Sequence, residues 1–355
     1  MKTDCIFQAI FEDRGAESRR KTVIIAELSA SHGQSLERAL ELIDVAADVG
    51  ADVVKLQTYR ADTITIDSER EYFIRDGTIW DGRKLYDLYE EAHTPWEWHQ
   101  ELFARANAAE IPIFSTPFDT SAVDFLETLD VPAYKIGSFE LIDIPLLERV
   151  ARTKKPLILS TGMATLLEIQ EAVLASRGQG AEKIALMKTN SAYPSPPDEI
   201  NLETIPHLRQ KFGLPVGLSD HSLGTAVPIA AVATGAQLVE KHLCLSRDIE
   251  TPDSRFAMEP DEFRQMVDGI RTTEKAMGSI CYGPTRQQEA SIINRRSLFI
   301  VQDIEAGHRL TPNNVRSIRP GHGLHPRYYE MILGIPVNRA ICRGTPLKWS
   351  DLATP

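Results

Sequence analysis

The sequence predicts a (β/α)₈ barrel, a TIM barrel, followed by a small β-rich domain. Eight short apolar segments, each followed by a segment with helical periodicity, occupy about 260 residues, which matches the number of units and the length of such a barrel. After Gly278 this alternation stops, and 355 residues are enough for about two domains. The alternative is an open doubly wound sheet, but no GxGxxG loop follows the first predicted strand.

The barrel is expected to begin with a buried strand at 23–28. Ser35 then caps a helix whose apolar residues recur with helical spacing, and Gly50 ends it. A second short apolar strand covers 53–57. A long polar connection with many aromatic residues, 58–93, separates this strand from the next helix.

Two capping boxes mark the starts of further helices. Thr94, with Pro95 and Glu97 after it, is expected to open a helix that runs through residue 109, and Thr165 with Glu168 opens another. The other predicted strands are 111–115, 133–136, 157–160 and 184–188, and the other predicted helices are 121–129, 144–151, 202–212 and 260–277.

The last two strands each end in a histidine. His221 follows the apolar run 216–218, and His242 follows the next apolar strand, after a crossover helix at 225–235. Both imidazoles should therefore point into one mouth of a parallel sheet. Two histidines leave room for water and substrate oxygens, as a catalytic divalent metal requires, although two ordinary hydrogen-bonded histidines are the alternative.

Cationic and polar side chains gather at the same end of the strands. Lys55, Lys135 and Lys241 bring like charges together, which is unfavourable unless an anion offsets them or they extend to solvent. Further polar residues at the strand ends are Thr116, Ser138, Ser160, Thr161, Asn190 and Ser219. Such a set suits a ligand with phosphate and carboxylate groups. Glu27 suits a sugar hydroxyl or proton transfer, or forms half of an ion pair.

Beyond the barrel, the sequence predicts a linker and a compact tail. We place the barrel domain at 23–280, after an N-terminal extension at 1–22, the linker at 281–295 and the small domain at 296–355. Short strands at 297–301 and 337–341 alternate there with glycine turns. This domain is too small for much core of its own, so it should lean on a barrel of the same subunit or of a partner.

The composition is typical of a globular protein outside the membrane. Hydrophobic residues make up 43% and charged residues 25% of the chain, and no apolar run reaches the roughly 18 residues that span a bilayer. The first residues lack the pattern of a secretory signal, so we expect a cytoplasmic protein. A net charge of −11 disfavours nucleic acids and anionic membranes as partners. The four cysteines show no CxxC spacing and are expected to be reduced.

Ordered motifs along residues 23–351 resemble the sialic acid synthase family. The barrel motifs are IAELSASHGQSLERALELI, GADVVKLQTY, STPFD, PAYKIGSFE, LILSTGMAT, NSAYPSPP, GLSDHSLG and VEKHL. The tail resembles the family's antifreeze-like (SAF, β-clip) domain through RRSLFIVQDIEAG, IRPGHGLHP and RGTPL. Within the family, WDGRKLYDLYEEAHTPWEWH and PDSRFAMEP resemble the pseudaminic acid branch more than the N-acetylneuraminate branch.

The resemblance implies a transferase that condenses phosphoenolpyruvate with an N-acetylated sugar. For the pseudaminic acid branch this sugar is 2,4-diacetamido-2,4,6-trideoxy-altropyranose, and a manno sugar of the N-acetylneuraminate or legionaminate branches is the alternative. By resemblance, His221 and His242 hold Mn²⁺ or Mg²⁺, and Glu27 binds the sugar. Phosphoenolpyruvate would be bound by Lys55, Lys135, Ser138, Ser160 and Ser219.

Two further roles follow from the resemblance, and a third residue is suggested by the mechanism. Tyr193 lies near the substrate, and Arg319 reaches from the small domain into the other subunit's barrel to contact the acylamino group, which implies a domain-swapped homodimer. Asp253 is a candidate for handling the proton of the attacking water, although an Asp beside Pro252 is more often a turn residue. The chain departs from the family pattern at 31–35 and at Thr189–Asn190.

Two other classes of function remain open from the sequence. A Schiff-base aldolase could use Lys135 or Lys188 as its nucleophile on the same barrel and would need no metal. A non-catalytic carbohydrate-binding protein would release no phosphate with any sugar. The paired histidines argue against the aldolase.

Overall fold

The computed structural model describes residues 6–7, 10–11 and 21–353. The chain divides into two compact units, Met1–Gly278 and Ser279–Pro355. Within the described residues, no helix combines the length and apolar character needed to cross a membrane.

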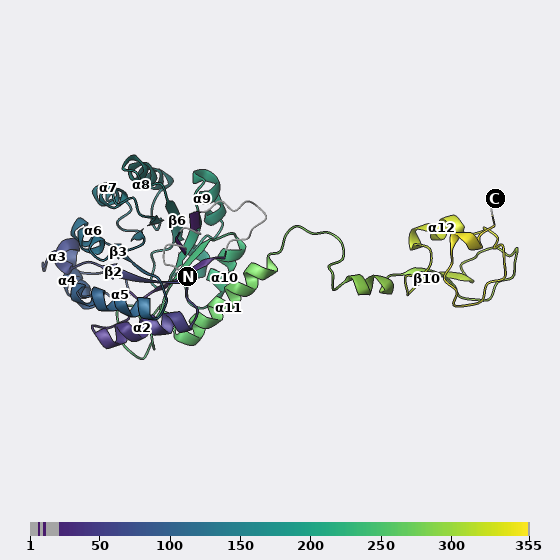
Figure 1. Cartoon of the computed structure of the whole chain (residues 1–355), viewed down its shortest axis with the longest axis horizontal. Coiled ribbons are helices and arrows are strands. Elements are labelled where there is room, and N and C mark those ends of the chain that lie inside the picture. Colours follow the sequence, from purple (N-terminus) through teal and green to yellow (C-terminus); the bar gives the residue numbers. More distant parts are fainter. Residues whose placement is uncertain (1–5, 8–9, 12–20, 354–355) are drawn as a thin grey trace. The chain divides into compact units, whose positions relative to one another are not determined.

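The first unit is a closed barrel of parallel strands with helices around it, so the predicted fold class is confirmed (Figure 1). Each strand pairs with the next along the chain, and the last closes onto the first. The strands are β1 (Val23–Glu27), β2 (Val53–Thr58), β3 (Ile113–Pro117), β4 (Tyr134–Ile136), β5 (Leu157–Ser160), β6 (Ile184–Thr189), β7 (Val216–Asp220) and β8 (Leu238–His242). The outer helices are α2 (Leu36–Asp48), α5 (His99–Ala108), α6 (Thr120–Glu127), α7 (Ile144–Ala151), α8 (Leu166–Gly178), α9 (Thr204–Phe212), α10 (Ala226–Ala233) and α11 (Pro260–Ala276).

Two of the three helix caps predicted from the sequence are confirmed. The Ser35 side chain accepts from the Arg38 amide, and Thr165 forms the expected capping box with Glu168. The cap predicted at Thr94 is wrong, because a short 3₁₀ turn, Trp96–Trp98, precedes α5 and has no side-chain cap. The Thr94 hydroxyl instead lies 3.3 Å from Nε2 of His32, a tertiary contact that sequence periodicity does not reveal.

The long connection after β2 is folded. It contains α3 (Ala61–Ile64), a 3₁₀ turn at Glu71–Phe73 and α4 (Leu85–Ala92). Its aromatic residues supply the packing: the Tyr59 ring lies edge-on to Tyr89, with 5.9 Å between ring centroids. The aromatic residues noted in the sequence therefore build a layer over one end of the barrel.

Alternate residues of each strand point into the barrel, and their side chains form two layers. At the amino ends, the inward side chains form an apolar cluster that includes Ile25, Phe114 and Leu238. Within the predicted N-terminal extension, residues 1–5, 8–9 and 12–20 lie outside the described residues, whereas Phe7 packs against Phe114 with 5.1 Å between ring centroids. At the carboxyl ends the inward positions are polar, so the two ends of the barrel differ in chemistry.

The second unit contains an antiparallel pair, β9 (Ser297–Ile300) and β10 (Val315–Ile318). The predicted strand at 297–301 is confirmed to within a residue, but the predicted strand at 337–341 is wrong. Val337 and Ile341 form isolated bridges to two different segments, at Leu352 and Ile304. Both side chains are buried, so the apolar pattern reflects burial in a small core rather than a strand.

A glycine in β7 sets how closely β8 can approach. A Cβ at Gly217 would lie 2.5 Å from the backbone oxygen of Leu238. We predict that Gly217→Ala lowers the free energy of unfolding, measured by urea titration, by about 1–3 kcal/mol, because the strands must separate. The control Gly178→Ala, at the end of α8 where a methyl group meets nothing within 4 Å, should cost nothing. Equal losses in both variants would contradict this constraint.

Candidate functional site

The main pocket opens at the carboxyl ends of the barrel strands. Its volume is about 380 Å³, and every strand of the barrel contributes to its lining. The inward side chains that line it from the strands include Glu27, Lys55, Thr116, Lys135, Ser160, Thr189, Ser219, Glu240 and His242. Ligands bind at this end of (β/α)₈ barrels, so the position is that of an active site.

Most of the residues singled out in the sequence meet in this pocket. Those that line it are Glu27, Lys55, Thr116, Lys135, Ser138, Ser160, Tyr193, Ser219, His221, His242 and Asp253. Thr161 and Asn190 do not line it, because each directly follows an inward residue and turns the other way. The Thr161 hydroxyl donates to the Met187 carbonyl at 3.1 Å. Arg319 belongs to the second unit.

The lysines of the pocket share one buried carboxylate that the sequence pattern did not single out. Glu240 accepts two hydrogen bonds from Nζ of Lys135, at 3.0 and 3.1 Å, and lies 3.7 Å from Nζ of Lys55. Lys55 also forms an ion pair with Glu27, and all four side chains are buried. Burial raises the pKa of Glu240, but the two ammonium groups outweigh burial and lower it to about 2. Its place two residues before His242, on the same side of β8, could have revealed it.

Lys241 departs from the prediction that three lysines face the mouth. Its neighbours Glu240 and His242 point inward, so Lys241 points outward, where Nζ donates to Oδ2 of Asp220 at 2.6 Å and to the carbonyl of Ser222. Asp220 in turn accepts from the Ser222 amide at 3.0 Å. Asp220 and Ser222 flank His221, so this buried ion pair ties β8 to the loop that carries the first histidine.

The paired histidines could hold a divalent metal while leaving coordination positions open. The ring centroids of His221 and His242 are 5.4 Å apart. Nδ1 of His221 donates to the carbonyl of Asn190 at 2.7 Å, because a carbonyl can only accept, and Nδ1 of His242 pairs with Oδ2 of Asp253 at 3.3 Å. Both Nε2 atoms are thus left to bind a ligand, with the outer nitrogens held as in metal sites.

The electrostatics of the pair agree with this use. Burial, together with the neighbouring His242, lowers the pKa of His221 to about 3, so the ring is neutral at pH 7, the form that binds a metal. Burial raises the pKa of Asp253, but hydrogen bonds from His242 and the Ala30 amide outweigh it and the pKa is lowered. Among the described residues, no cluster of three or more His, Cys, Asp or Glu side chains could hold a metal. A divalent ion at the two histidines would need water and substrate to complete its coordination.

Aromatic rings form the wall behind the histidines. Tyr193 lies 4.3 Å from His221 and Phe256 lies 4.9 Å from His242, measured between ring centroids. Trp80, from the connection after β2, lies 5.7 Å from Tyr193 and donates from Nε1 to the carbonyl of Pro252 at 3.2 Å. This wall shields the histidines from bulk water and links the connection to the site.

Other conspicuous residues serve the fold. His32, within the segment 31–35 that departs from the family pattern, accepts from the Gln34 amide at 3.1 Å and does not line the pocket. Lys188 donates to the carbonyl of Thr189 and likewise faces away from the pocket.

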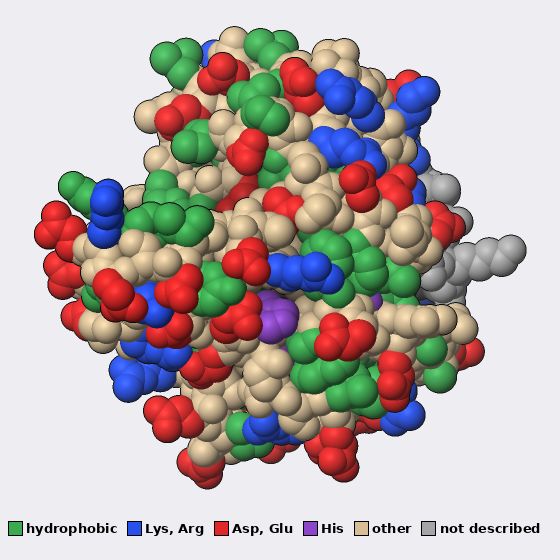
Figure 2. Space-filling view, turned by 90° about the vertical axis from the view of Figure 1, so that its left-hand side faces the viewer, with side chains coloured by type: hydrophobic (Ala, Val, Ile, Leu, Met, Phe, Trp, Pro, Cys, Tyr) green, Lys and Arg blue, Asp and Glu red, His purple; other side chains and the backbone are tan. Residues whose placement is uncertain are grey.

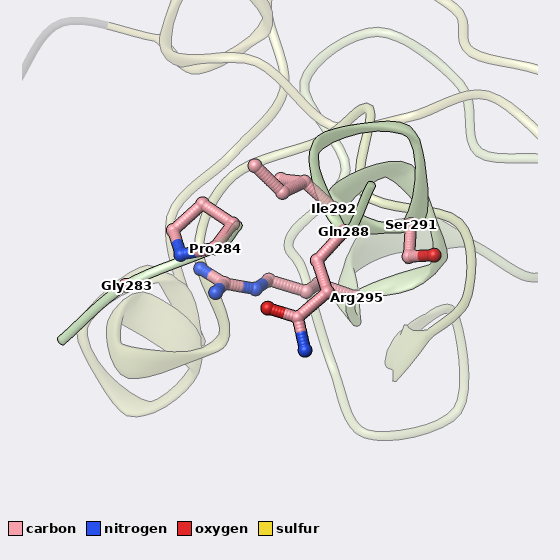
Figure 3. Close-up of a pocket in the computed structure, with 6 residues that line it drawn as sticks. All are labelled: Gly283, Pro284, Gln288, Ser291, Ile292 and Arg295. Carbon is pink, nitrogen blue, oxygen red and sulfur yellow. The ribbon is translucent and has the colours of Figure 1, made fainter. Parts of the chain in front are cut away.

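Another hollow, of about 410 Å³, lies in the second unit between Gly283 and Arg295 (Figure 3). Arg295 is the single charged side chain among the described residues that line this hollow, so they offer no carboxylate or imidazole for catalysis.

His99 gives a testable dependence of stability on pH. Its Nε2 lies 2.8 Å from Oγ1 of Thr58, and burial lowers its pKa to about 4 against 6.5 in the unfolded chain. The unfolded state therefore binds more protons between these values, and the free energy of unfolding falls as pH falls from 6.5 to 4, by up to roughly 3 kcal/mol.

The measurement is urea unfolding at about pH 7 and about pH 4.5. We expect His99→Gln to lose less stability on acidification than the wild type, because a glutamine does not titrate. His207→Gln, which removes an exposed histidine, should follow the wild type. An acid loss in His99→Gln as large as that of the wild type would refute this assignment.

Comparisons with known proteins agree with the fold and the pocket. The NeuB family matches residues 42–282, and the SAF domain matches 295–353. A pseudaminic acid synthase of Campylobacter jejuni (strain 81-176) is 44% identical over 94% of this chain and 97% of its own, and one of Helicobacter pylori is 43% identical over 93% and 97%. The solved N-acetylneuraminic acid synthetase of Leptospira borgpetersenii, in complex with citrate, has a TM-score of 0.68 and 30% identity, covering 79% of this chain and 95% of that one. A parallel barrel with this polar mouth, together with these matches, places the chain in the NeuB family.

Proposed function

We propose that this protein condenses phosphoenolpyruvate with 2,4-diacetamido-2,4,6-trideoxy-altropyranose and water, giving pseudaminic acid and phosphate. The observation that carries the proposal is that two histidines with free Nε2 atoms share one pocket with the ammonium groups of Lys55 and Lys135. The choice of sugar is supported by the identity of 43–44% to two pseudaminic acid synthases, against 30% to the N-acetylneuraminic acid synthetase.

The residues of the pocket divide the two substrates between them. Lys55 and Lys135 would bind the carboxylate and phosphate of phosphoenolpyruvate, assisted by the hydroxyls of Ser138, Ser160 and Ser219. Glu27 and Tyr193 lie beside the histidines and would bind the open-chain sugar. Holding both substrates in one pocket lowers the entropic cost of the bimolecular step.

The histidines would hold the ion that binds the reacting aldehyde. His221 and His242 would hold Mn²⁺ or Mg²⁺ through Nε2, and the bound ion would supply Lewis-acid polarisation of the aldehyde oxygen. C3 of phosphoenolpyruvate then attacks the aldehyde carbon, and positive charge develops at C2. Water adds at C2, and the C–O bond to phosphate breaks. Asp253, which pairs with His242, would take up the proton of this water.

The surface and the composition favour small molecules as substrates. Acidic, basic and apolar side chains are interspersed over the face drawn in Figure 2, and basic side chains form no continuous stripe on it. With a net charge of −11, the protein would not attract nucleic acid or anionic membranes. We accordingly propose that it works in the cytoplasm on small substrates.

The proposal predicts which sugar is used. Phosphate release from phosphoenolpyruvate would be measured with manganese and three sugars: the 2,4-diacetamido-2,4,6-trideoxy sugars of altro and manno configuration, and N-acetylmannosamine. We expect turnover with the altro sugar, abolished by chelator and by His242→Ala, whereas His207→Ala, an exposed residue, keeps full activity. With ¹⁸O in the C2–O bridge of phosphoenolpyruvate, the label should leave with phosphate, because the C–O bond breaks.

Other outcomes would point to the alternatives. Turnover only with a manno sugar would keep the mechanism and assign the chain to the legionaminate or N-acetylneuraminate branch. Turnover without metal, with a pyruvate adduct trapped by borohydride, would favour the Schiff-base aldolase. Lys135 is already held by Glu240 in two hydrogen bonds, and Lys188 faces away from the pocket, so neither is placed as a nucleophile. No phosphate release with any sugar would favour a binding protein.

We also propose that the protein works as a domain-swapped homodimer in which Arg319 contacts the acylamino group in the partner's barrel. The family resemblance supports this arrangement, and the barrel and the small domain are separate compact units.

We predict that Arg319→Ala and His242→Ala are each inactive alone but regain about a quarter of wild-type activity when equal amounts are mixed and allowed to exchange subunits. About half of the dimers are then mixed, and each mixed dimer keeps one intact site of two. Absence of recovery, with exchange verified by tagged subunits, would place Arg319 in its own subunit's site, and full activity of Arg319→Ala alone would place it outside catalysis.

A further inference from the structure

Beyond the histidines, the lysines and Glu27, which is paired with Lys55, two ionisable side chains of the pocket each have one buried polar atom without a hydrogen-bond partner in the described part of the chain. Nε of Arg75 and Oε2 of Glu140 are buried, and neither has a hydrogen-bond partner among the described residues. Both side chains line the pocket, yet no ion pair joins them. A buried polar atom without a partner costs free energy, so its persistence in a pocket indicates a ligand group that satisfies it.

The fold holds both groups in place. The backbone of Arg75 is bonded twice to the turn that follows it, from its amide to the Arg83 carbonyl at 2.8 Å and from the Gly82 amide to its own carbonyl at 2.9 Å. Its guanidinium carbon lies 5.9 Å from the ring of Trp80. Glu140 folds over Gly137, where a Cβ would lie 2.3 Å from Oε2, so the glycine leaves the space for this carboxyl group. Such preorganisation is typical of groups that select a ligand.

The order of the rings places Arg75 away from the reacting end. Tyr193 packs on His221, Trp80 packs on Tyr193, and the Arg75 guanidinium lies over Trp80. A sugar whose aldehyde lies at the histidines therefore extends its later carbons toward Arg75. Apolar residues also line the pocket, among them Ile64, Leu88 and Phe118.

We infer that Arg75 and Glu140 form a subsite for a second acylamino group, the one on C4 of the sugar. This inference rests on the proposed function and deepens it. The guanidinium donates to the amide carbonyl, Oε2 of Glu140 accepts from the amide N–H, and the methyl group lies against Leu88 and Phe118. An acylamino group presents a donor, an acceptor and a methyl group together, whereas a hydroxyl lacks the methyl. Burial raises the pKa of Glu140 to about 7, because the charged carboxylate is poorly solvated there. A neutral amide ligand adds no further charge to this buried site.

The test compares two sugars that differ at C4 only. They are the diacetamido altro sugar and its analogue with a hydroxyl in place of the 4-acetamido group, assayed by phosphate release or, where the analogue is inert, as a competitive inhibitor. For Arg75→Met and for Glu140→Leu we expect kcat/KM for the diacetamido sugar to fall about ten- to a hundredfold. The kcat/KM or inhibition constant of the analogue and the KM for phosphoenolpyruvate should change less than about threefold.

Two further variants separate recognition from structure. Arg75→Lys keeps the charge but loses the planar fork, so it should recover only part of the selectivity. Arg70→Met removes an exposed cation from the same segment and should leave both sugars unaffected. Equal losses for both sugars, or no loss with the diacetamido sugar, would overturn the subsite while the proposed function stands. Wild-type enzyme without turnover on the diacetamido sugar would remove the proposed function and the subsite with it.

Discussion

The interaction on which the site depends is the buried carboxylate of Glu240 between two buried ammonium groups. Burial lowers the pKa of Lys55 and Glu240 opposes that shift, so this carboxylate offsets part of the cost of burying an ammonium group beside Lys135. The network also includes Glu27 and the hydroxyl of Ser219, which donates to Glu240 at 3.2 Å. Its charges balance in the absence of a ligand, so an anionic substrate must draw the lysines partly away from these carboxylates. The barrel thus keeps a polar mouth above an apolar floor.

Strand β8 carries polar groups on both of its sides, and each side has a separate task. Glu240 and His242 point into the pocket, whereas Lys241 points outward to Asp220. Because Asp220 and Ser222 flank His221, the outer ion pair sets the position of one histidine from the strand that carries the other. The ion pair between Lys241 and Asp220, which lies outside the pocket, thereby helps to set the spacing of the two imidazoles inside it. Its formation requires the desolvation of a lysine and an aspartate.

In the proposed function, the barrel provides the chemistry and the connection after β2 contributes to the choice of sugar. The strands supply the histidines, the lysines and the hydroxyls, which suit a shared reaction of phosphoenolpyruvate. The connection supplies Trp80 and Arg75 from outside the strand pattern, anchored by the hydrogen bond from Trp80 to the carbonyl of Pro252. A (β/α)₈ barrel tolerates changes in its loops because the loops pack on the barrel without altering the hydrogen bonds between its strands.

The sequence by itself determined the barrel and the strand ends that carry the chemistry, because strand and helix periods are local and strand ends converge in a parallel barrel. It therefore predicted that Lys55, Lys135, His221 and His242 would meet. Only the tertiary structure decided which way neighbouring residues face: Lys241, Thr161 and Asn190 turn away, while Glu240 and Thr189 enter the pocket. That choice depends on the register of each strand against its neighbours. Tertiary structure also decided that Thr94 contacts His32 rather than capping a helix. It likewise brought Arg75 and Glu140 into one pocket, because their segments meet only in the folded chain.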